Sequence, residues 1–172
     1  HSGNKSNLSL ERVVSFGDCD AAFLGATHIF REKLWQHKGS GQSMETRGVL
    51  ASHDAVEDLL TLGTSSQVPH RVQAMISGML NLQEKEVRVI APAVGGGFGP
   101  KFVLYPEDVS IALATQLLNR PVKWIEDRRE HFSATVHERD QYWDIEVAVD
   151  QDGCLLGVRG DLIHDQGAYS LV

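Results

Sequence analysis

The chain has 172 residues, of which 42% are hydrophobic and 23% are charged, the composition of an ordinary globular protein. Its net charge of −7, without any cluster of lysine or arginine, excludes a nucleic-acid backbone as the main partner. No apolar run is long enough to span a bilayer and the polar N-terminus is no signal peptide, so we expect a cytoplasmic protein without a membrane span. Cys19 and Cys154 match no zinc or haem spacing and are expected to be buried, reduced thiols.

The two ends of the chain predict its organisation. Residues 1–14 are polar, begin with His-Ser-Gly, and are interpreted as a linker or a cloning remnant. Residues 15–172 are expected to be the folded part. Because the chain stops in the apolar run GAYSLV, without a cap or a polar exit, we expect it to be a truncated piece of a longer polypeptide.

In chain order, the first predicted element is a turn and short helix at 15–26, with Asp18 or Asp20 as the N-cap. A half-buried strand follows at 27–38, because apolar and polar residues alternate there. Further strands are predicted at 44–54, 57–67, 86–92 and 120–127. Residues 141–165 predict a β-hairpin that turns at Asp152-Gly153.

Two longer helices are predicted between these strands. Residues 69–82 begin at Pro69 and place on one face Val72, Met75, Ile76, Met79 and Leu80. Residues 106–119 begin at Pro106, carry acids in their first turn, and have an apolar side made of Ile111, Leu113, Ala114, Leu117 and Leu118. Together the elements predict an α+β fold, with a mixed sheet and packed helices.

A glycine-rich loop follows the strand at 86–92, in the sequence AVGGGFGPK. The dinucleotide fingerprint counted from Gly95 requires a sixth-place glycine, where the chain has Pro100. A Walker A loop requires Ser or Thr after its lysine, where Lys101 is followed by Phe102. Consecutive glycines mean either that the turn needs positive φ angles, or that a ligand packs where a Cβ would collide.

Six motifs carry a family resemblance: QHKGSGQSMETRGVLASHD (36–54), TSSQVPHR (64–71), VRVIAPAVGGGFGPK (87–101), RPVKWIEDRREHF (120–132), HERD (137–140) and DQGAY (165–169). In this order and spacing, they resemble the molybdenum hydroxylases, the family of xanthine dehydrogenase, aldehyde oxidase and aerobic carbon monoxide dehydrogenase. The resemblance covers the chain from about Leu10 to Val172. GGGFG, PVKWIEDR and the RD after TVHE most closely resemble the carbon monoxide dehydrogenase large subunit.

The resemblance implies that residues 15–172 are the N-terminal part of a molybdopterin-binding domain in a larger oxidoreductase subunit. The implied cofactor is a pyranopterin whose dithiolene holds molybdenum, in its plain or its cytosine dinucleotide form. The implied reaction is oxidative hydroxylation of a small molecule with water as the oxygen source. FAD and 2Fe-2S clusters are implied on partner subunits, in an oligomer of heterotrimers. The chain alone is expected to be inactive.

The resemblance also implies roles for single residues. It assigns cofactor binding to Gln67, Gly96, Gly97, Phe98 and Gly99. Gln67 matches the glutamine whose amide donates to an oxygen ligand of molybdenum, and the glycines match a loop whose backbone amides meet the cofactor. Phe98 and Arg139 match substrate-side positions, Gly95 is expected to serve the turn, and no residue is expected to bind the metal directly. Phe98 as a core plug and Arg139 as a structural residue are the alternatives.

This chain departs from the family pattern in two ways, which bear on the expected substrate and on the catalytic residues. Purine-oxidising members carry a glutamate where this chain has Phe102, so xanthine is not expected as the substrate. The catalytic glutamate and the copper-binding cysteine of the family are expected downstream of Val172. We therefore expect no catalytic residue within this chain.

Several other residues have plain structural interpretations. Lys101 is expected either to contact a cofactor phosphate or to cap the loop from the surface. Glu45 is expected to be a buried carboxylate satisfied by backbone amides. His37, His70 and His131 are expected to be structural, and the charged run 127–130 a solvated or ion-paired turn. Two rival functions remain: a non-catalytic scaffold module of the same fold, or an unrelated glycine-loop phosphate-binding domain.

Overall fold

The computed structural model describes residues 6–138 and 140–167, which divide into two units. The first unit joins the residues up to Gln36 to Asp140–Asp165. The second contains the described residues from His37 to Glu138, with Gln166 and Gly167. Each unit is a layer of strands with helices, as the α+β prediction requires. No helix in the described ranges is both long and apolar enough to cross a bilayer.

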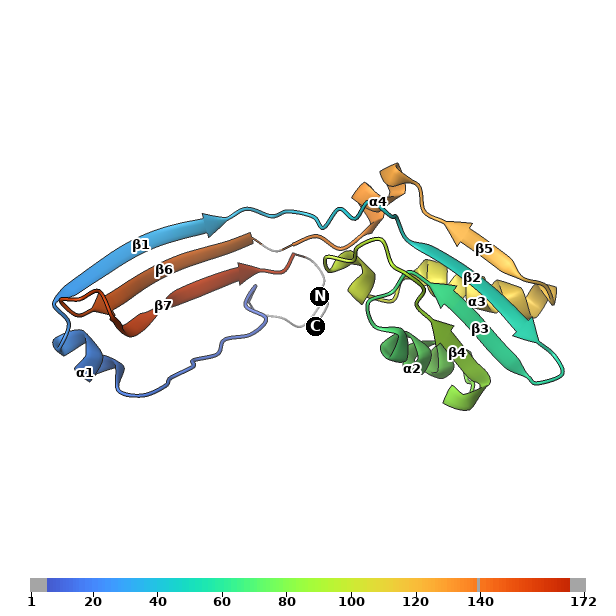
Figure 1. Ribbon diagram of the computed structural model, residues 1–172, viewed down its shortest axis with the longest axis horizontal. Helices are drawn as coiled ribbons and strands as arrows, with labels where there is room; N and C mark the ends of the chain where they lie inside the picture. The colour runs from blue at the N-terminus through green and yellow to red at the C-terminus, as the bar shows by residue number, and fades with distance from the viewer. Residues whose placement is uncertain (1–5, 139, 168–172) are drawn as a thin grey trace. The chain divides into compact units, whose positions relative to one another are not determined.

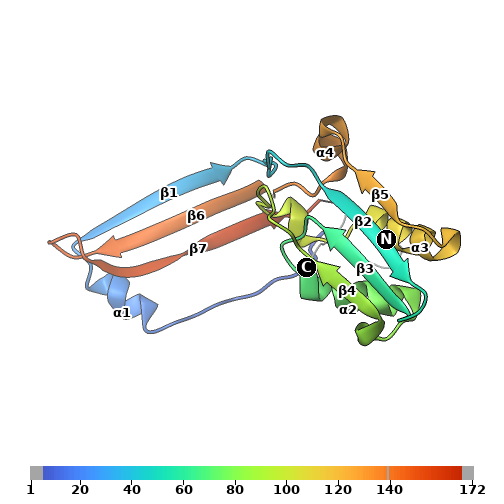
Figure 2. The ribbon, with the colours of Figure 1, turned by 45° about the vertical axis from the view of Figure 1, so that its right-hand side comes forward.

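The first unit is a three-stranded antiparallel sheet in the order β1-β6-β7 (Figure 1). Its strands are β1 (His28–Gln36), β6 (Asp140–Val149) and β7 (Leu155–Asp165). β6 and β7 form the hairpin predicted around Asp152-Gly153, where Gly153 has a φ of 81°. The short helix α1 (Cys19–Leu24) lies beside the start of β7 (Figure 2). As predicted, Asp18 is its N-cap, because its carboxylate accepts the Ala21 N–H at 3.0 Å.

Two expectations for this unit are wrong. Every residue of β1 is exposed, not half-buried, because within this unit α1 covers only one end of the sheet. The thiols are not buried either: Cys19 is partly exposed on α1 and Cys154 is exposed in the hairpin turn. Neither cysteine forms a disulfide with the described residues.

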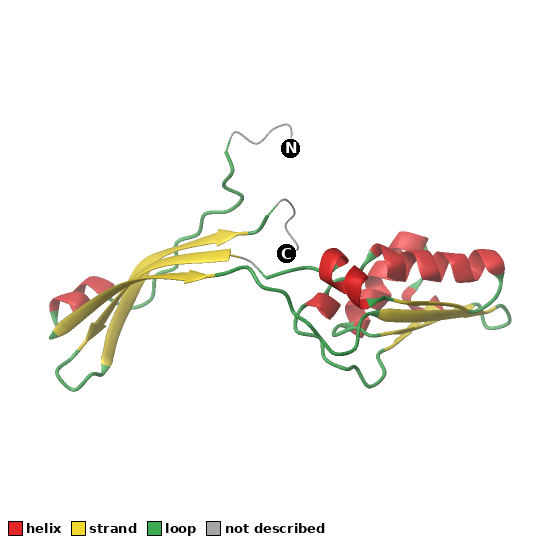
Figure 3. Ribbon diagram, turned by 90° about the horizontal axis from the view of Figure 1, so that it is seen from above, coloured by secondary structure: helices red, strands yellow, loops and turns green. Residues whose placement is uncertain are grey.

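The second unit is a four-stranded sheet in the order β4-β3-β2-β5. Its strands are β2 (Gly48–Asp54), β3 (Leu59–Thr64), β4 (Val87–Ile90) and β5 (Val122–Ile125). Neighbouring strands are antiparallel except β3 and β4, which run parallel. Two helices, α2 (Pro69–Leu80) and α3 (Pro106–Leu118), cover one face of this sheet (Figure 3). Shorter helices are η1 (Glu84–Glu86), η2 (Pro100–Phe102) and α4 (Arg128–Ala134).

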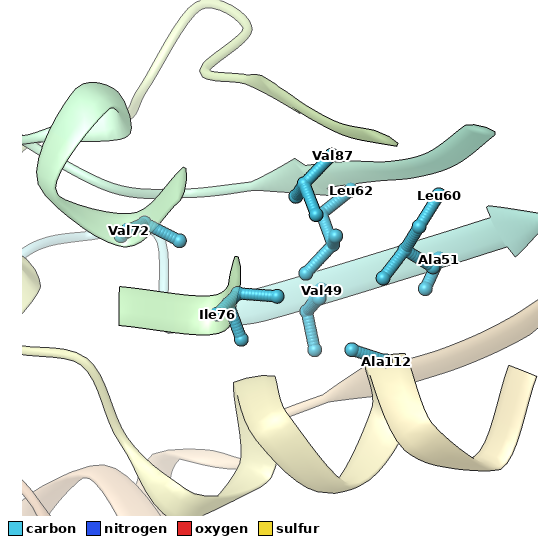
Figure 4. Close-up of a cluster of buried hydrophobic side chains, with 8 residues drawn as sticks. All are labelled: Val49, Ala51, Leu60, Leu62, Val72, Ile76, Val87 and Ala112. Carbon is cyan, nitrogen blue, oxygen red and sulfur yellow. The ribbon is translucent and has the colours of Figure 1, made fainter. Parts of the chain in front are cut away.

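The core of this unit lies between the sheet and the two long helices. Alternate residues of the strands point toward the helices, because successive side chains of a strand face opposite ways. The buried cluster comprises Val49, Ala51, Leu60, Leu62, Val87, Val72, Ile76 and Ala112 (Figure 4). Burial of these side chains holds the sheet against the helices, and the strand order determines where the connecting loops meet.

The helices are where predicted, but α3 buries a different face. Its fully buried residues are Ala112 and Thr115, whereas Leu117 is 76% exposed. Small residues let the helix approach β2 closely, and the Thr115 hydroxyl donates to the Ala51 carbonyl at 3.3 Å. In this unit, close helix–sheet contact therefore outweighs the burial of leucines.

The helix α4 was not predicted, since its start was interpreted as a charged turn. Asp127 accepts the Glu130 N–H at 2.8 Å, and the Glu130 carboxylate accepts the Asp127 N–H at 2.9 Å. This reciprocal pair is a capping box, and an acidic residue followed three places later by glutamate is its sequence signal. The charged run is thus the first turn of a helix.

Candidate functional site

Four segments that are distant in sequence meet at one edge of the four-stranded sheet. β3 and β4 run parallel and end side by side at Gly63 and Ile90, so the segments that follow them leave the sheet at the same edge. β2 begins at this edge, since Val49 lies opposite Thr64, and β5 ends there beside Gly48. The segments that gather at this edge are 41–47, 64–67, 91–102 and 126–131.

Gln67 lies directly against the glycine loop. The Gly99 N–H donates to Oε1 of Gln67 at 3.1 Å, and the Gln67 N–H donates to the Lys101 carbonyl at 2.9 Å. A Cβ on Gly97 would lie 2.5 Å from Cγ of Gln67, so only glycine allows this approach. The loop and the amide that the sequence placed together are therefore neighbours.

The bond from Gly99 fixes the orientation of the Gln67 amide. A backbone N–H can only donate, so the side-chain atom that it meets must be the carbonyl oxygen. The two N–H groups of Nε2 are then left over, and no residue in the described part of the chain accepts from them. The Gln67 side chain is exposed, so these donors are accessible to a ligand.

The glycine loop adds backbone donors beside this amide. Among residues 6–138 and 140–167, none accepts a hydrogen bond from the N–H groups of Gly96, Gly97 or Phe98. Backbone N–H groups normally have a partner, so three unpaired donors in sequence form a surface suited to an oxygen-rich or anionic ligand. Gly95 differs, since its N–H donates to the Glu45 carboxylate at 2.9 Å.

Phe98 occupies the tip of the loop in a strained conformation. Its φ of 53° is in the left-handed region, which costs a non-glycine residue about 1–2 kcal/mol. Its ring folds over Gly96, where a Cβ would lie 2.6 Å from Cε2 of the ring, and Gly96 itself has a φ of 92°. The Phe98 residue is 71% exposed, so it is not part of the core of this chain. Strain retained at an exposed aromatic is typical of functional sites.

The surface position expected for Lys101 and the burial expected for Glu45 are both wrong. The Lys101 side chain is fully buried, and its Nζ lies 2.6 Å from Glu45 Oε2. The Glu45 side chain is 43% exposed instead of buried, although it accepts the predicted amide bond, from Gly95. The hydrogen bond from Lys101 lowers the pKa of Glu45; partial burial opposes this shift and the Gly95 amide reinforces it.

Residues of the preceding segment support the loop and were missed by the sequence analysis. A Cβ on Gly41 would lie 2.5 Å from the Phe98 carbonyl oxygen and 2.6 Å from Cδ of Pro100. Ser43 is buried beneath Gly96, and its hydroxyl donates to the Glu45 carbonyl at 2.6 Å. The paired glycines of KGSGQ were the available signal, because such spacing often marks a close approach of two backbones.

A buried ionic network links segments 41–47 and 126–131 at the same edge. Arg47 donates from Nε and Nη2 to Oε1 of Glu126, at 2.9 and 2.6 Å, and its guanidinium lies 3.7 Å from the centre of the Tyr105 ring. Nδ1 of His131 lies 2.7 Å from the other Glu126 oxygen, and its Nε2 is 3.3 Å from the Gly41 carbonyl. His131 is therefore structural, as expected, and it links α4 to the segment that supports the loop.

The pKa of Glu126 reflects this network. Burial alone would raise the pKa, but the hydrogen bonds from Arg47 and His131 outweigh it, so the pKa lies below the ordinary glutamate value. The carboxylate is thus held ionised between its partners. A second carboxyl at this edge, Asp108, behaves oppositely, because burial raises its pKa.

Some predicted positions remain outside this geometry. Arg139 lies outside the described residues. No group of three or more His, Cys, Asp or Glu side chains within the described ranges is placed to hold a metal ion.

Comparisons with known proteins show which proteins this chain is similar to. The sequence pattern of the molybdopterin cofactor-binding domain family matches residues 1–172. The nicotine 6-hydroxylase large subunit of Paenarthrobacter nicotinovorans is 39% identical over 96% of this chain and 20% of its own length. The carbon monoxide dehydrogenase large chain of Hydrogenophaga pseudoflava is 38% identical over 87% of this chain and 19% of its own.

A solved structure agrees with these sequence relatives. Quinoline 2-oxidoreductase from Pseudomonas putida 86 superimposes with a TM-score of 0.74 and 35% identity, over 88% of this chain and 19% of that chain. The chain thus spans about a fifth of the length of these two curated relatives.

Proposed function

Because the chain belongs to the molybdopterin cofactor-binding domain family, we propose that it forms one wall of a molybdenum-cofactor site in a larger oxidoreductase subunit. The single observation that carries this proposal is the contact of Gln67 with the glycine loop, which brings unpaired amide donors from two segments to one place. The whole subunit, with its partner subunits, is proposed to hydroxylate a small molecule with water as the oxygen source.

The residues present fit an oxygen-rich, bulky group such as molybdopterin. The unpaired N–H groups of Gly96, Gly97 and Phe98 are donors held by the fold before any ligand arrives. Nε2 of Gln67 adds two more donors without adding charge. A side chain at Gly97 would collide with Gln67, so the bare backbone at this point is a requirement of the site.

When bound, molybdopterin supplies a dithiolene-held molybdenum that exchanges two electrons with the substrate. In this proposal the chain's own residues hold and orient that group. Gln67 would donate from Nε2 to an oxygen of the bound group. The N–H groups of Gly96, Gly97 and Phe98 would donate to the cofactor, and Gly99 would line it while its own N–H holds Gln67. Because Gln67 Oε1 is already bonded to Gly99, its amide cannot rotate freely, so the donors are preorganised.

The substrate side of the site is proposed to include Phe98 and Arg139. Phe98 supports this role, since its ring is exposed beside the unpaired amides. Phe102 is 40% exposed and lies 5.2 Å from the Arg71 guanidinium, where purine-oxidising relatives have a glutamate, so xanthine is not the proposed substrate. No catalytic base is assigned to this chain, and we place it in the rest of the subunit.

The remaining parts of the assembly are also proposals. We propose that 2Fe-2S and FAD subunits receive the electrons. The names of two relatives, a complex subunit gamma and a large chain, support an assembly of several subunits. The complex is proposed to be an oligomer of heterotrimers in the cytoplasm. The cofactor is proposed to be either the plain pterin or its cytosine dinucleotide form.

Metal analysis of the full-length subunit tests the proposal. The subunit would be expressed with its partners, and molybdenum per subunit measured for the parent, for Gln67→Ala and for Gln151→Ala. Gln151 is the matched control, since it is exposed in the hairpin turn of the first unit and makes no side-chain hydrogen bond to the described residues. We expect one molybdenum per parent subunit, a severalfold loss in Gln67→Ala and no loss in the control.

Two results would contradict the proposal. A parent complex without molybdenum, but folded and assembled, would favour the scaffold module. Tight binding of inorganic phosphate by a metal-free parent, lost in Gly97→Ala, would favour the phosphate-binding alternative.

A further inference from the structure

Lys101 is a buried lysine next to the glycine loop. Its side chain is fully buried, yet it carries an ammonium group that loses its hydration on burial. Among the residues that the structure describes, its Nζ has one carboxylate partner, Glu45, at 2.6 Å. A buried charge retained in this way needs a reason, because replacing a buried ion pair by apolar side chains is often neutral or stabilising.

The contacts of Lys101 connect Gln67 to the start of the glycine loop. Its carbonyl accepts the Gln67 N–H at 2.9 Å and so fixes the backbone that presents the glutamine amide. Its ammonium holds Glu45 Oε2, and the same oxygen accepts the Gly95 N–H at 2.9 Å. Gly95 immediately precedes the unpaired amides of Gly96 and Gly97.

The packing around this oxygen leaves little freedom. A Cβ on Gly95 would lie 2.5 Å from Cβ of Glu45, so the loop backbone rests directly on the glutamate side chain. The Glu45 N–H also meets the Gly95 carbonyl, at 3.4 Å. Gly95 therefore serves close packing more than turn geometry, because its φ is not positive.

We propose that Glu45 and Lys101 are positioning residues, which hold the first amide of the glycine loop so that the next three face the cofactor. This inference rests on the proposed function. In this arrangement Lys101 orients the carboxylate, the carboxylate holds the Gly95 N–H, and Gly95 sets the direction in which the chain enters the turn. Neither side chain touches the cofactor itself.

Two double variants of the full-length complex separate positioning from stability. In Glu45→Leu with Lys101→Met, the ion pair is replaced by apolar groups and the Gly95 N–H loses its acceptor. In Glu45→Gln with Lys101→Met, the charges are removed as well, but the glutamine oxygen can still accept from Gly95. The two variants thus differ in the hydrogen bond that the proposal depends on.

The matched control is Glu57→Leu with Lys123→Met. Both control residues are exposed in the second unit, and no described residue is an ion-pair partner of either side chain. Molybdenum per subunit, the thermal midpoint of the cofactor-free complex, and the electron paramagnetic resonance spectrum of the reduced metal would be measured for all variants.

We expect the two double variants to have similar cofactor-free thermal midpoints. We expect the leucine variant to retain about tenfold less molybdenum than the glutamine variant, the effect of losing one hydrogen bond of ordinary strength. The spectrum of the residual metal should be shifted in the leucine variant and unchanged in the control. Molybdenum contents that equal the control in both variants, or that simply follow the thermal midpoints, would overturn the inference.

The parent protein distinguishes this inference from the proposed function. If the parent complex contains no molybdenum, the proposed function itself fails, and with it this inference. If the parent contains molybdenum and Gln67→Ala loses it, while both double variants retain it, only the role of the ion pair is wrong.

Discussion

Gly97 and Gly78 are two glycines of the same unit with opposite surroundings. A Cβ on Gly97 would collide with the Gln67 side chain, whereas a Cβ on Gly78, in α2, would meet nothing within 4 Å. Alanine in place of a helical glycine stabilises a protein by about 0.5–1 kcal/mol. We therefore expect Gly78→Ala to raise the thermal midpoint and Gly97→Ala to lower both the midpoint and the molybdenum content. Equal effects of the two substitutions would contradict a close-packed Gln67.

Phe98 and Phe23 form a second matched pair. Phe98 is 71% exposed, while Phe23 is 7% exposed and packs against Gly157 and the Arg159 guanidinium. Truncation of a buried phenylalanine costs about 3–5 kcal/mol. We expect Phe98→Ala to change the unfolding free energy of the cofactor-free subunit by less than about 1 kcal/mol. Thermal unfolding checks this, and a loss as large as that of Phe23→Ala would show that Phe98 is a packing residue.

At the site, residues that stand in a recognisable motif could be predicted, whereas contacts between distant residues could not. The glycine run and Gln67 could be found because their spacing is unusual and matches a family motif. The burial of Lys101 could not, because lysine is almost never fully buried and its carboxylate partner is 56 positions away. Phe98 was correctly placed in the loop, but its φ of 53° follows from contacts with Gly96 that no local pattern records.

At the scale of elements, the buried Arg47–Glu126 pair joins the start of β2 to the end of β5. Removal of one partner from a buried ion pair costs about 3–5 kcal/mol, because the other charge is left unpaired. We expect Arg47→Met to destabilise the subunit by this amount, as measured by thermal or denaturant unfolding. Lys123→Met, on the exposed face of β5, is the control and should change stability by less than about 0.5 kcal/mol.

The same pair predicts a pH dependence. The pKa of Glu126 is lower in the folded protein than in the unfolded chain, so its stabilising contribution is complete above the unfolded pKa of about 4.3. The contribution is lost as the pH falls through the lower, folded pKa. We expect the thermal midpoint of the parent to exceed that of Glu126→Gln near neutral pH, and the difference to shrink below about pH 4. A difference that stays constant down to pH 3 would contradict the lowered pKa.

Local sequence patterns predicted the positions of helices and strands better than they predicted which face of an element is buried. The β6–β7 hairpin and the two long helices are where turn residues, prolines and periodicity placed them. The buried face of α3 was wrong, because apolar periodicity ranks leucine above alanine, whereas close contact with β2 requires Ala112 and Thr115. The helix α4 was missed because its seven residues are too few to show a periodicity, and only the capping box marks it.

At the scale of the whole chain, the candidate site depends on strand order. The parallel pairing of β3 and β4 brings the segment after Thr64 and the segment after Ile90 to the same edge. Periodicity cannot supply this order, since it identifies strands but not their neighbours. The family resemblance supplied what local physics could not, namely the expectation that Gln67 and the glycine loop lie together. The long-range contact between Gln67 and Gly99 agrees with it.

The openness of this edge leads to a prediction about the isolated chain. Gln67, Phe98 and Gly99 are all exposed, so a cofactor resting on them would be covered on one side by this chain. Cofactor sites normally bury about 70–90% of the ligand surface, and affinity falls when half of that enclosure is missing. We expect the 172-residue chain, mixed with molybdopterin released from the parent complex, to lose it during gel filtration, while the full-length subunit retains it. Far-ultraviolet circular dichroism would establish that the isolated chain is folded. Stoichiometric retention by the folded chain would mean that this edge encloses the cofactor without help from the rest of the subunit.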